Sequence, residues 1–105
     1  MAPSDVEARL HAATSSLVSE LISLTPETMA EIQFEIVSTS DGGADVGLLE
    51  NHPAAKQVTL SEAVYRCVSQ YLPLVRAYLP GWKRSLMVLR ESADGWKVSV
   101  EFERA

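Results

Sequence analysis

The sequence of 105 residues has little of what small proteins use for covalent or metal stabilisation. It contains one cysteine, Cys67, and two histidines, His11 and His52. A single cysteine cannot close an internal disulfide, and these three residues have no zinc-site spacing. With 5 glycines and 5 prolines, the chain is neither collagen-like nor of low complexity. We therefore expect a hydrophobic core to provide its stability, and a chain of this length can build one.

Long hydrophobic runs are also absent, because nothing approaches the roughly 20 apolar residues that span a bilayer. The first residues, Met1-Ala2-Pro3-Ser4-Asp5, contain no basic segment, and no hydrophobic block follows them. We therefore expect no secretory signal, no membrane partner and a cytoplasmic location. Hydrophobic residues make up 47% and charged residues 22% of the chain, as in an average globular protein. We expect one domain over residues 1–105.

Basic residues are scarce in the first half of the chain. Residues 1–55 contain nine acidic residues against Arg9 alone, a charge of −8. Residues 56–105 contain five acidic and eight basic residues, a charge of +3, so the whole chain carries −5. Without an overall basic footprint we expect no nucleic-acid partner. An acidic surface serves either solubility or a basic protein partner, and the charge alone leaves both open.

Two segments have the 3.6-residue apolar period of amphipathic helices. The first is expected to follow Ser4 as its N-cap and to end near Leu24, ahead of Pro26. The second is expected to follow Thr59 as its N-cap and to end before residues 80–81. A proline at position 73 lies inside this second segment, so we expect a kink in the preceding turn, near Ser69 to Tyr71.

Residues 31–36 alternate between polar and apolar side chains, which predicts a half-buried strand. The turn residues Asp41-Gly42-Gly43 and a second strand over residues 46–50 complete a hairpin. Residues 56–58 are expected to add a short third strand. The exposed face of this first hairpin would carry Glu31, Glu35 and Asp45.

A second hairpin is predicted from residues 84–90 and 96–103, with the turn at Asp94-Gly95. Residues 96–103 alternate strictly and are the clearest strand of the chain, with Trp96 at the start of its apolar set. Residues 84–90 are apolar on both faces, which suggests a central strand. A three-residue loop pairs Val88 with Val100, whereas a loop of two or four residues places the neighbours of Val88 beside Val100.

These elements predict an α+β fold with the order α-β-β-(short β)-α-β-β. An antiparallel sheet with both amphipathic helices packed on one face buries their apolar stripes most economically. The other face of the sheet would then be open to solvent or to a partner.

No set of residues in the sequence predicts an active site. Cys67 lies in an apolar stripe and is expected to be a core residue, with His11 exposed on a helix and His52 in a loop. Glu31 and Glu35 share a strand face, which an acid–base pair would need, but an exposed face of an acidic protein accounts for them better. We expect no catalytic residue, no metal and no cofactor. Trp82 is expected to pack in the core rather than to anchor an interface.

The arrangement resembles the YezG-like immunity family, small bacterial antitoxins of polymorphic toxin systems. The likeness covers nearly the whole chain and rests on the element order and on three segments. These are Leu24-Thr25-Pro26-Glu27 at the entry to the first strand, Trp82 after the second helix, and the terminal Val98-Ser99-Val100-Glu101-Phe102-Glu103. The third strand and the aromatic content of the first hairpin are weaker than in the family.

The resemblance implies a protein that binds and neutralises a cognate toxin, with a nuclease toxin as our expectation. Because a nuclease presents positive charge to phosphate, acidic residues would speed and strengthen the encounter. On the first hairpin we expect toxin contacts from Glu31, Glu35, Asp41, Asp45 and Glu50; a helix-face interface would instead involve Glu20 and Glu27. The protein would be a monomer or a weak homodimer. The alternative function is a small acidic secretion chaperone that binds an effector segment.

Overall fold

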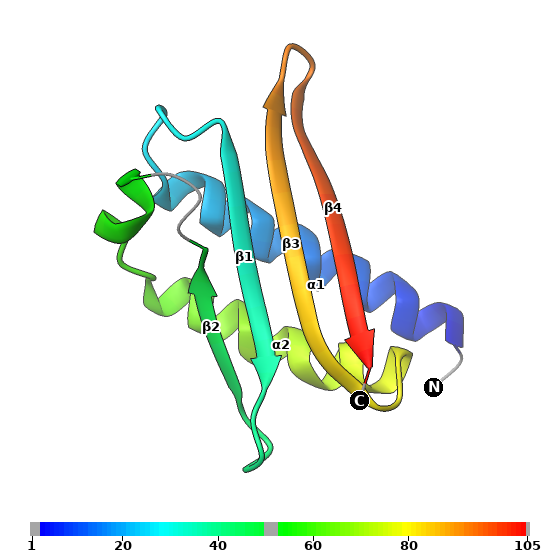
Figure 1. Cartoon of the computed structure of the whole chain (residues 1–105). Helices are drawn as coiled ribbons and strands as arrows, with labels where there is room; N and C mark the ends of the chain where they lie inside the picture. Colours follow the sequence, from blue (N-terminus) through cyan, green and yellow to red (C-terminus); the bar gives the residue numbers. More distant parts are fainter. Residues whose placement is uncertain (1–2, 50–52, 105) are drawn as a thin grey trace.

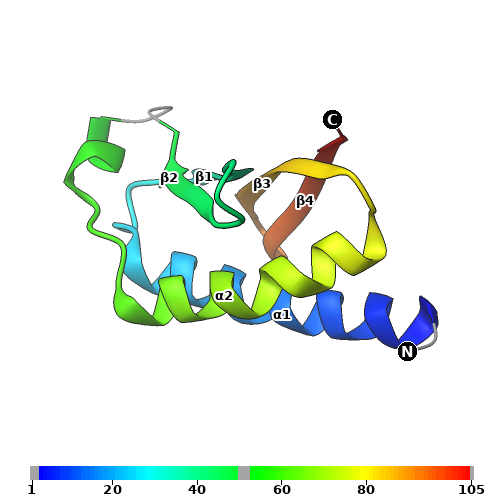
Figure 2. The same cartoon turned by 90° about the horizontal axis from the view of Figure 1, so that it is seen from below.

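The computed structural model describes residues 3–49 and 53–104 and has an α+β fold, as the sequence predicts. Four antiparallel strands form one sheet in the order β2-β1-β3-β4, so β1 and β3 are central and β2 and β4 are the edges. Both helices pack on the same face of the sheet (Figures 1 and 2). In chain order the elements are α1 (Pro3–Leu24), β1 (Glu31–Ser38), β2 (Ala44–Leu48), the 3₁₀ helix η1 (Pro53–Gln57), α2 (Glu62–Tyr78), β3 (Trp82–Ser92) and β4 (Gly95–Arg104).

The core lies between the helices and the inner face of the sheet. One residue in two along β1 and β3 is fully buried there, as the alternating pattern of β1 predicted. Burying a Leu, Ile or Phe side chain stabilises the fold by about 1.5–3 kcal/mol, so this layer is the main source of stability. Its fully buried members include Leu17, Leu21, Ile32, Phe34, Ile36, Val64, Tyr71, Val75, Met87 and Leu89.

Helix α1 begins at Pro3, one residue before the predicted cap at Ser4. Proline is favoured at the first helical position because its missing N–H would have no partner there. The helix ends at Leu24 as predicted, and the next residue, Thr25, donates its backbone N–H to the carbonyl of Leu21 (3.2 Å).

Helix α2 begins two residues later than the sequence suggested. Its N-cap is Ser61, not Thr59, and the Ser61 hydroxyl accepts the backbone N–H of Val64 (3.3 Å). Both residues are good caps, so the tertiary position of the helix decides which one is used. Pro73 lies inside the helix, which continues past it to Tyr78. Proline has no N–H for the carbonyl of the residue four positions earlier, Ser69, and both Ser69 and Pro73 are exposed to water.

The short strand expected at residues 56–58 is wrong, because the structure has the 3₁₀ helix η1 at Pro53–Gln57 instead. Proline at its first position sets the backbone dihedral that a helical turn requires and offers no N–H to a strand ladder. Ala55 is buried and attaches this segment to the rest of the molecule.

The second hairpin has a two-residue loop, since Ser92 pairs with Gly95. This register pairs Met87 with Val100 and settles the alternative that the sequence left open. Met87 and Leu89 therefore face the helices, whereas Leu86 and Val88 lie on the opposite face of the sheet.

Candidate functional site: the open face of the sheet

The face of the sheet that points away from both helices is formed by strands from both hairpins (Figure 2). We call it the open face. The strand registers place on it every second residue of each strand. Its side chains are Asp45 of β2; Glu31, Gln33, Glu35 and Val37 of β1; Arg84, Leu86, Val88 and Arg90 of β3; and Lys97, Ser99, Glu101 and Glu103 of β4.

Two arginines of β3 cross to the acidic residues of β1. Arg90 lies opposite Glu31 in the register, and its Nε donates to a Glu31 carboxylate oxygen at 2.5 Å. Arg84 donates through Nε to a Glu35 carboxylate oxygen at 2.5 Å. Each pair joins the first hairpin to the second, so both acids are partly neutralised by the neighbouring strand.

Arg84 also reaches β4 on its other side, where its Nη1 lies 3.4 Å from a Glu103 carboxylate oxygen. The pKa of Arg84 is raised, first by the hydrogen bond to Glu35 and also by the nearby acidic charges. Such half-exposed ion pairs contribute about 0.2–1 kcal/mol each, so they order the side chains more than they stabilise the fold.

The middle of the open face is less polar than its rim. Leu86 and Val88 of β3 are half-buried there, whereas the half-buried Val37 of β1 lies in the end row beside Arg84. Gln33 lies opposite Val88, between the two ion-paired glutamates of β1, and its amide donates to Glu31 (2.8 Å). The open face therefore has a weakly apolar centre surrounded by charges, which is the usual composition of a protein interface.

The structure brings together three of the five acids predicted to contact a toxin. Glu31, Glu35 and Asp45 share the open face, with Asp45 exposed at the β2 edge. Asp41 lies in the turn between β1 and β2 rather than on a strand face. Glu50 lies outside the described residues.

Asp41 is held by its own turn. Its Oδ1 accepts the backbone N–H of Gly43 (3.1 Å) and the hydroxyl of Thr39. The Thr39 hydrogen bond, followed by that of Gly43, lowers the pKa of Asp41. Gly42 has a positive φ of 87°, which a tight turn requires and which favours glycine. The Asp41 carboxylate is thus a charged, exposed group at a defined position.

Sequence reasoning missed the basic partners on this face. Arg84 and Arg90 lie six residues apart, at the two ends of a run that is apolar on both faces. The sequence did not show whether the even-numbered or the odd-numbered residues of β3 face the helices. The length of the loop decides this, and the loop length was not predicted. The open face carries five acids and three bases among the described residues, a charge of −2 rather than the uniform acidity that the first hairpin suggested.

The residues considered for chemistry are dispersed. Cys67 is half-buried on α2, where burial and the charge of Glu20 raise the pKa of its thiol, which disfavours the reactive thiolate. His11 is exposed on α1, as expected, and His52 lies outside the described residues. Among residues 3–49 and 53–104, no three His, Cys, Asp or Glu side chains are grouped as a metal site.

Tyr71, Trp82 and Ser85 form a hydrogen-bonded cluster inside the core. The Ser85 hydroxyl accepts the indole N–H of Trp82 (2.9 Å) and lies 2.7 Å from the hydroxyl of Tyr71. Burial raises the pKa of Tyr71 to about 12. Trp82 is buried, which confirms that it packs, and the Arg76 guanidinium lies 5.9 Å from its ring centroid. These polar groups are used within the fold.

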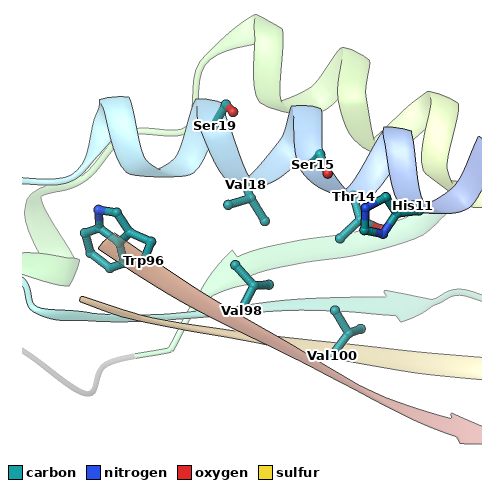
Figure 3. A pocket seen from close by; sticks show the side chains of 8 residues that line it. All are labelled: His11, Thr14, Ser15, Val18, Ser19, Trp96, Val98 and Val100. Atoms are coloured by element: carbon teal, nitrogen blue, oxygen red, sulfur yellow. The ribbon is translucent and has the colours of Figure 1, made fainter. Parts of the chain in front are cut away.

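A separate hollow lies on the helix side of the sheet, between α1 and β4 (Figure 3). This groove has a volume of about 490 Å³. The figure shows Val98 and Val100 directed from β4 toward α1, and Val18 directed from α1 toward the strand. It contains no acidic side chain, and His11 is its only titratable lining residue among those described.

Comparison of the sequence with protein-family models gives no match, and comparison with curated proteins gives none either. Within the described part of the chain, neither helix has the length and apolarity needed to cross a membrane.

Proposed function

We propose that this protein is an immunity protein that binds and neutralises a bacterial toxin in the cytoplasm, with the open face as its contact surface. The observation that carries the proposal is the open face itself, which no helix in the described part of the chain covers and which has a half-buried apolar centre within a charged rim. The resemblance to the YezG-like immunity family points to the same function.

The charge arrangement favours a partner with its own basic surface. The acids at the two edges of the face, Asp45 on β2 and Glu101 on β4, have no arginine beside them in the register. Arg84 and Arg90, in contrast, are engaged by Glu31 and Glu35. The remaining field is negative at the rim, which would attract the phosphate-binding surface of a nuclease.

The size of the face predicts which further residues take part. Strands spaced about 4.8 Å apart, with about eight residues each, give the four-stranded face an area of roughly 500 Å². A standard interface buries about 800 Å² per partner. The turn at residues 39–43 is the adjoining acidic segment, so Asp41 is expected to extend the contact.

The test begins with capture of partners from the source bacterium, followed by co-expression of each partner with this protein. We expect a partner with a basic toxic domain whose growth inhibition is abolished by co-expression. The reversal Asp45→Lys should weaken this rescue, whereas Glu27→Lys, an equal charge change outside the open face, should not. A stronger effect of Glu27→Lys would place the interface on the helix side.

The alternative function as a secretion chaperone is favoured by the groove between α1 and β4, because chaperones hold extended segments along apolar surfaces and strand edges. Capture of several secreted proteins through their N-terminal segments, without rescue from a toxin, would support this alternative and contradict the immunity function.

A further inference from the structure

Strand β4 is a long sheet edge whose inner side chains are poorly covered. It spans ten residues, twice the length of β2 at the other edge, and β3 is its sheet partner. Natural proteins protect such edges with prolines, bulges or charges that point inward. From Gly95 to Phe102 the register with β3 is regular, there is no proline, and every inward side chain is apolar.

The inner face of β4 is apolar but incompletely buried. Val98 is 42% exposed and Phe102 is 38% exposed, although both alternate with polar residues as core residues would. Val98 borders the groove along α1, whose facing residues Thr14, Ser15 and Ser19 are small (Figure 3), whereas the Phe102 ring lies 6.3 Å from that of Tyr78. This groove leaves room for further apolar side chains beneath β4.

Every second residue of β4 also directs its backbone N–H and C=O groups away from β3, toward the open edge of the sheet. The N–H of Glu91 donates to the carbonyl of Ala30 next to β1 (2.8 Å), and successive residues of a strand direct their backbone groups to opposite sides. The even-numbered residues of β3 therefore point to β4, and their register partners are the odd-numbered residues 97–103. The remaining residues direct their backbone groups at the open edge: Trp96, Val98, Val100 and Phe102.

We propose that a second copy of this chain pairs with β4 in antiparallel orientation, centred on Ser99, and forms a two-fold dimer with a continuous sheet. The sequence around Ser99 is self-complementary in this register. Val98 meets Val100 of the second copy, and Trp96 meets Phe102 of the second copy, both on the inner face. On the outer face, Lys97 meets Glu101 of the second copy, and two-fold symmetry repeats each contact.

Neighbouring registers match less well. Centring on Val100 keeps an apolar pair of Val98 with Phe102 and places Lys97 opposite Glu103, but Glu103 is already engaged by Arg84. This register also places Trp96 opposite Arg104 on the inner face, and Ser99 opposite Glu101 on the outer face. Centring on Val98 removes both Lys–Glu contacts, because Lys97 then meets Ser99. Charge complementarity and apolar pairing together therefore select the Ser99-centred register.

The dimer is expected to be weak and concentration-dependent. The strand is about 34 Å long, so pairing through it buries roughly 1,000 Å² in total, at the lower end for specific interfaces. We expect wild-type protein to change from monomer to dimer between about 1 and 500 µM in sedimentation equilibrium. The proposal is independent of any toxin, since it requires only this chain.

Charge exchange tests the register. Lys97→Glu and Glu101→Lys each place like charges opposite one another and should weaken dimerisation about tenfold. The double variant should restore it, and an equimolar mixture of the two single variants should form heterodimers. Asp45→Lys, which makes the same charge change as Glu101→Lys but at the β2 edge, is the matched control for that variant and should dimerise like wild type.

Cross-linking gives a second measurement that does not depend on affinity. In a Cys67→Ala background, Ser99→Cys should form an intermolecular disulfide under mild oxidation. In this register residue 99 of one copy lies opposite residue 99 of the other, with about 4.5–5.5 Å between their Cα atoms. Lys97→Cys should cross-link at least tenfold more slowly, since its copy lies about 14 Å away along the strand. A wild-type monomer at every concentration, equal cross-linking at both positions, or single charge variants that dimerise normally would each overturn the proposal.

Discussion

Ser85 shows how one residue organises the polar part of this core. In the described part of the chain, Ser85 is the one buried residue with a polar, non-aromatic side chain. Its hydroxyl is hydrogen-bonded to both Trp82 and Tyr71. Every buried side-chain nitrogen or oxygen in the described part of the chain has a hydrogen-bond partner. The cluster links β3 to α2, so its loss would affect both layers.

The substitution Ser85→Ala should lower the free energy of unfolding by about 2–4 kcal/mol, because it leaves the Trp82 N–H and the Tyr71 hydroxyl without their buried partner. Urea unfolding measures this loss. Ser99→Ala on the exposed face of β4 is the control and should change stability by less than about 0.5 kcal/mol. A loss from Ser85→Ala as small as that of the control would show that the cluster is not stabilising.

Tyr71 predicts a decrease of stability in alkaline solution. Burial is the first cause of its raised pKa, which is about 12 in the folded protein, whereas a tyrosine in water has a pKa of about 10. Between pH 10 and 12 the unfolded chain loses the phenol proton while the folded chain keeps it, so stability falls as the pH rises, by at most about 1.4 kcal/mol per pH unit. Unfolding measured across this range should show a shallower decline for Tyr71→Phe; an identical decline would contradict the assignment.

At the scale of elements, the start of α2 separates what is local from what is tertiary. Thr59 and Ser61 both precede the apolar stripe, and Thr59 completes a capping box with Glu62. The structure uses Ser61, whose hydroxyl binds the N–H of Val64. Local sequence therefore located the helix but did not choose between two adequate caps.

The choice of cap gives a direct prediction. Ser61→Ala should lower the free energy of unfolding by about 1 kcal/mol, whereas Thr59→Ala should have little effect because Thr59 is exposed and precedes the cap. Paired urea titrations of the two variants measure the difference. The reverse order of effects would mean that α2 starts at the capping box read from the sequence.

The two hairpins differ in how far their patterns could be read. In β1 the alternation of Ile32, Phe34 and Ile36 with polar residues correctly predicts which face of the strand is buried. In β3, Leu86 to Leu89 are all apolar, so the buried face depends on loop length and was left open. The arginines at positions 84 and 90 were missed as partners of β1 for the same reason.

At the scale of the whole molecule, charge is distributed differently from its distribution along the chain. The first half of the sequence carries −8, yet β3 brings arginines from the second half into contact with Glu31 and Glu35. The surface proposed for a toxin is therefore a mixed face with negative edges, and long-range attraction depends on the net charge of −5 as well as on local acids.

This distribution predicts the kinetics of the proposed complex. The association rate with a basic toxin should fall about tenfold between 50 and 500 mM salt, while the dissociation rate changes much less. Stopped-flow measurements with the captured partner test this. A salt-independent association rate would instead indicate apolar recognition, as in the chaperone alternative.

The sequence by itself determined the two helices, the four strands, the two turns and the buried stripe of α1, because apolar periodicity and turn residues act locally. The apolar stripes of the two helices then require a common sheet face to cover them. Tertiary structure alone decided the 3₁₀ turn at Pro53–Gln57, which face of β3 is buried against the helices, and the ion pairs across the open face. It also placed β4 at an edge, where strict alternation at Trp96 to Phe102 leaves apolar residues partly exposed. Alternation states which face a side chain takes, whereas its burial depends on what other elements cover that face.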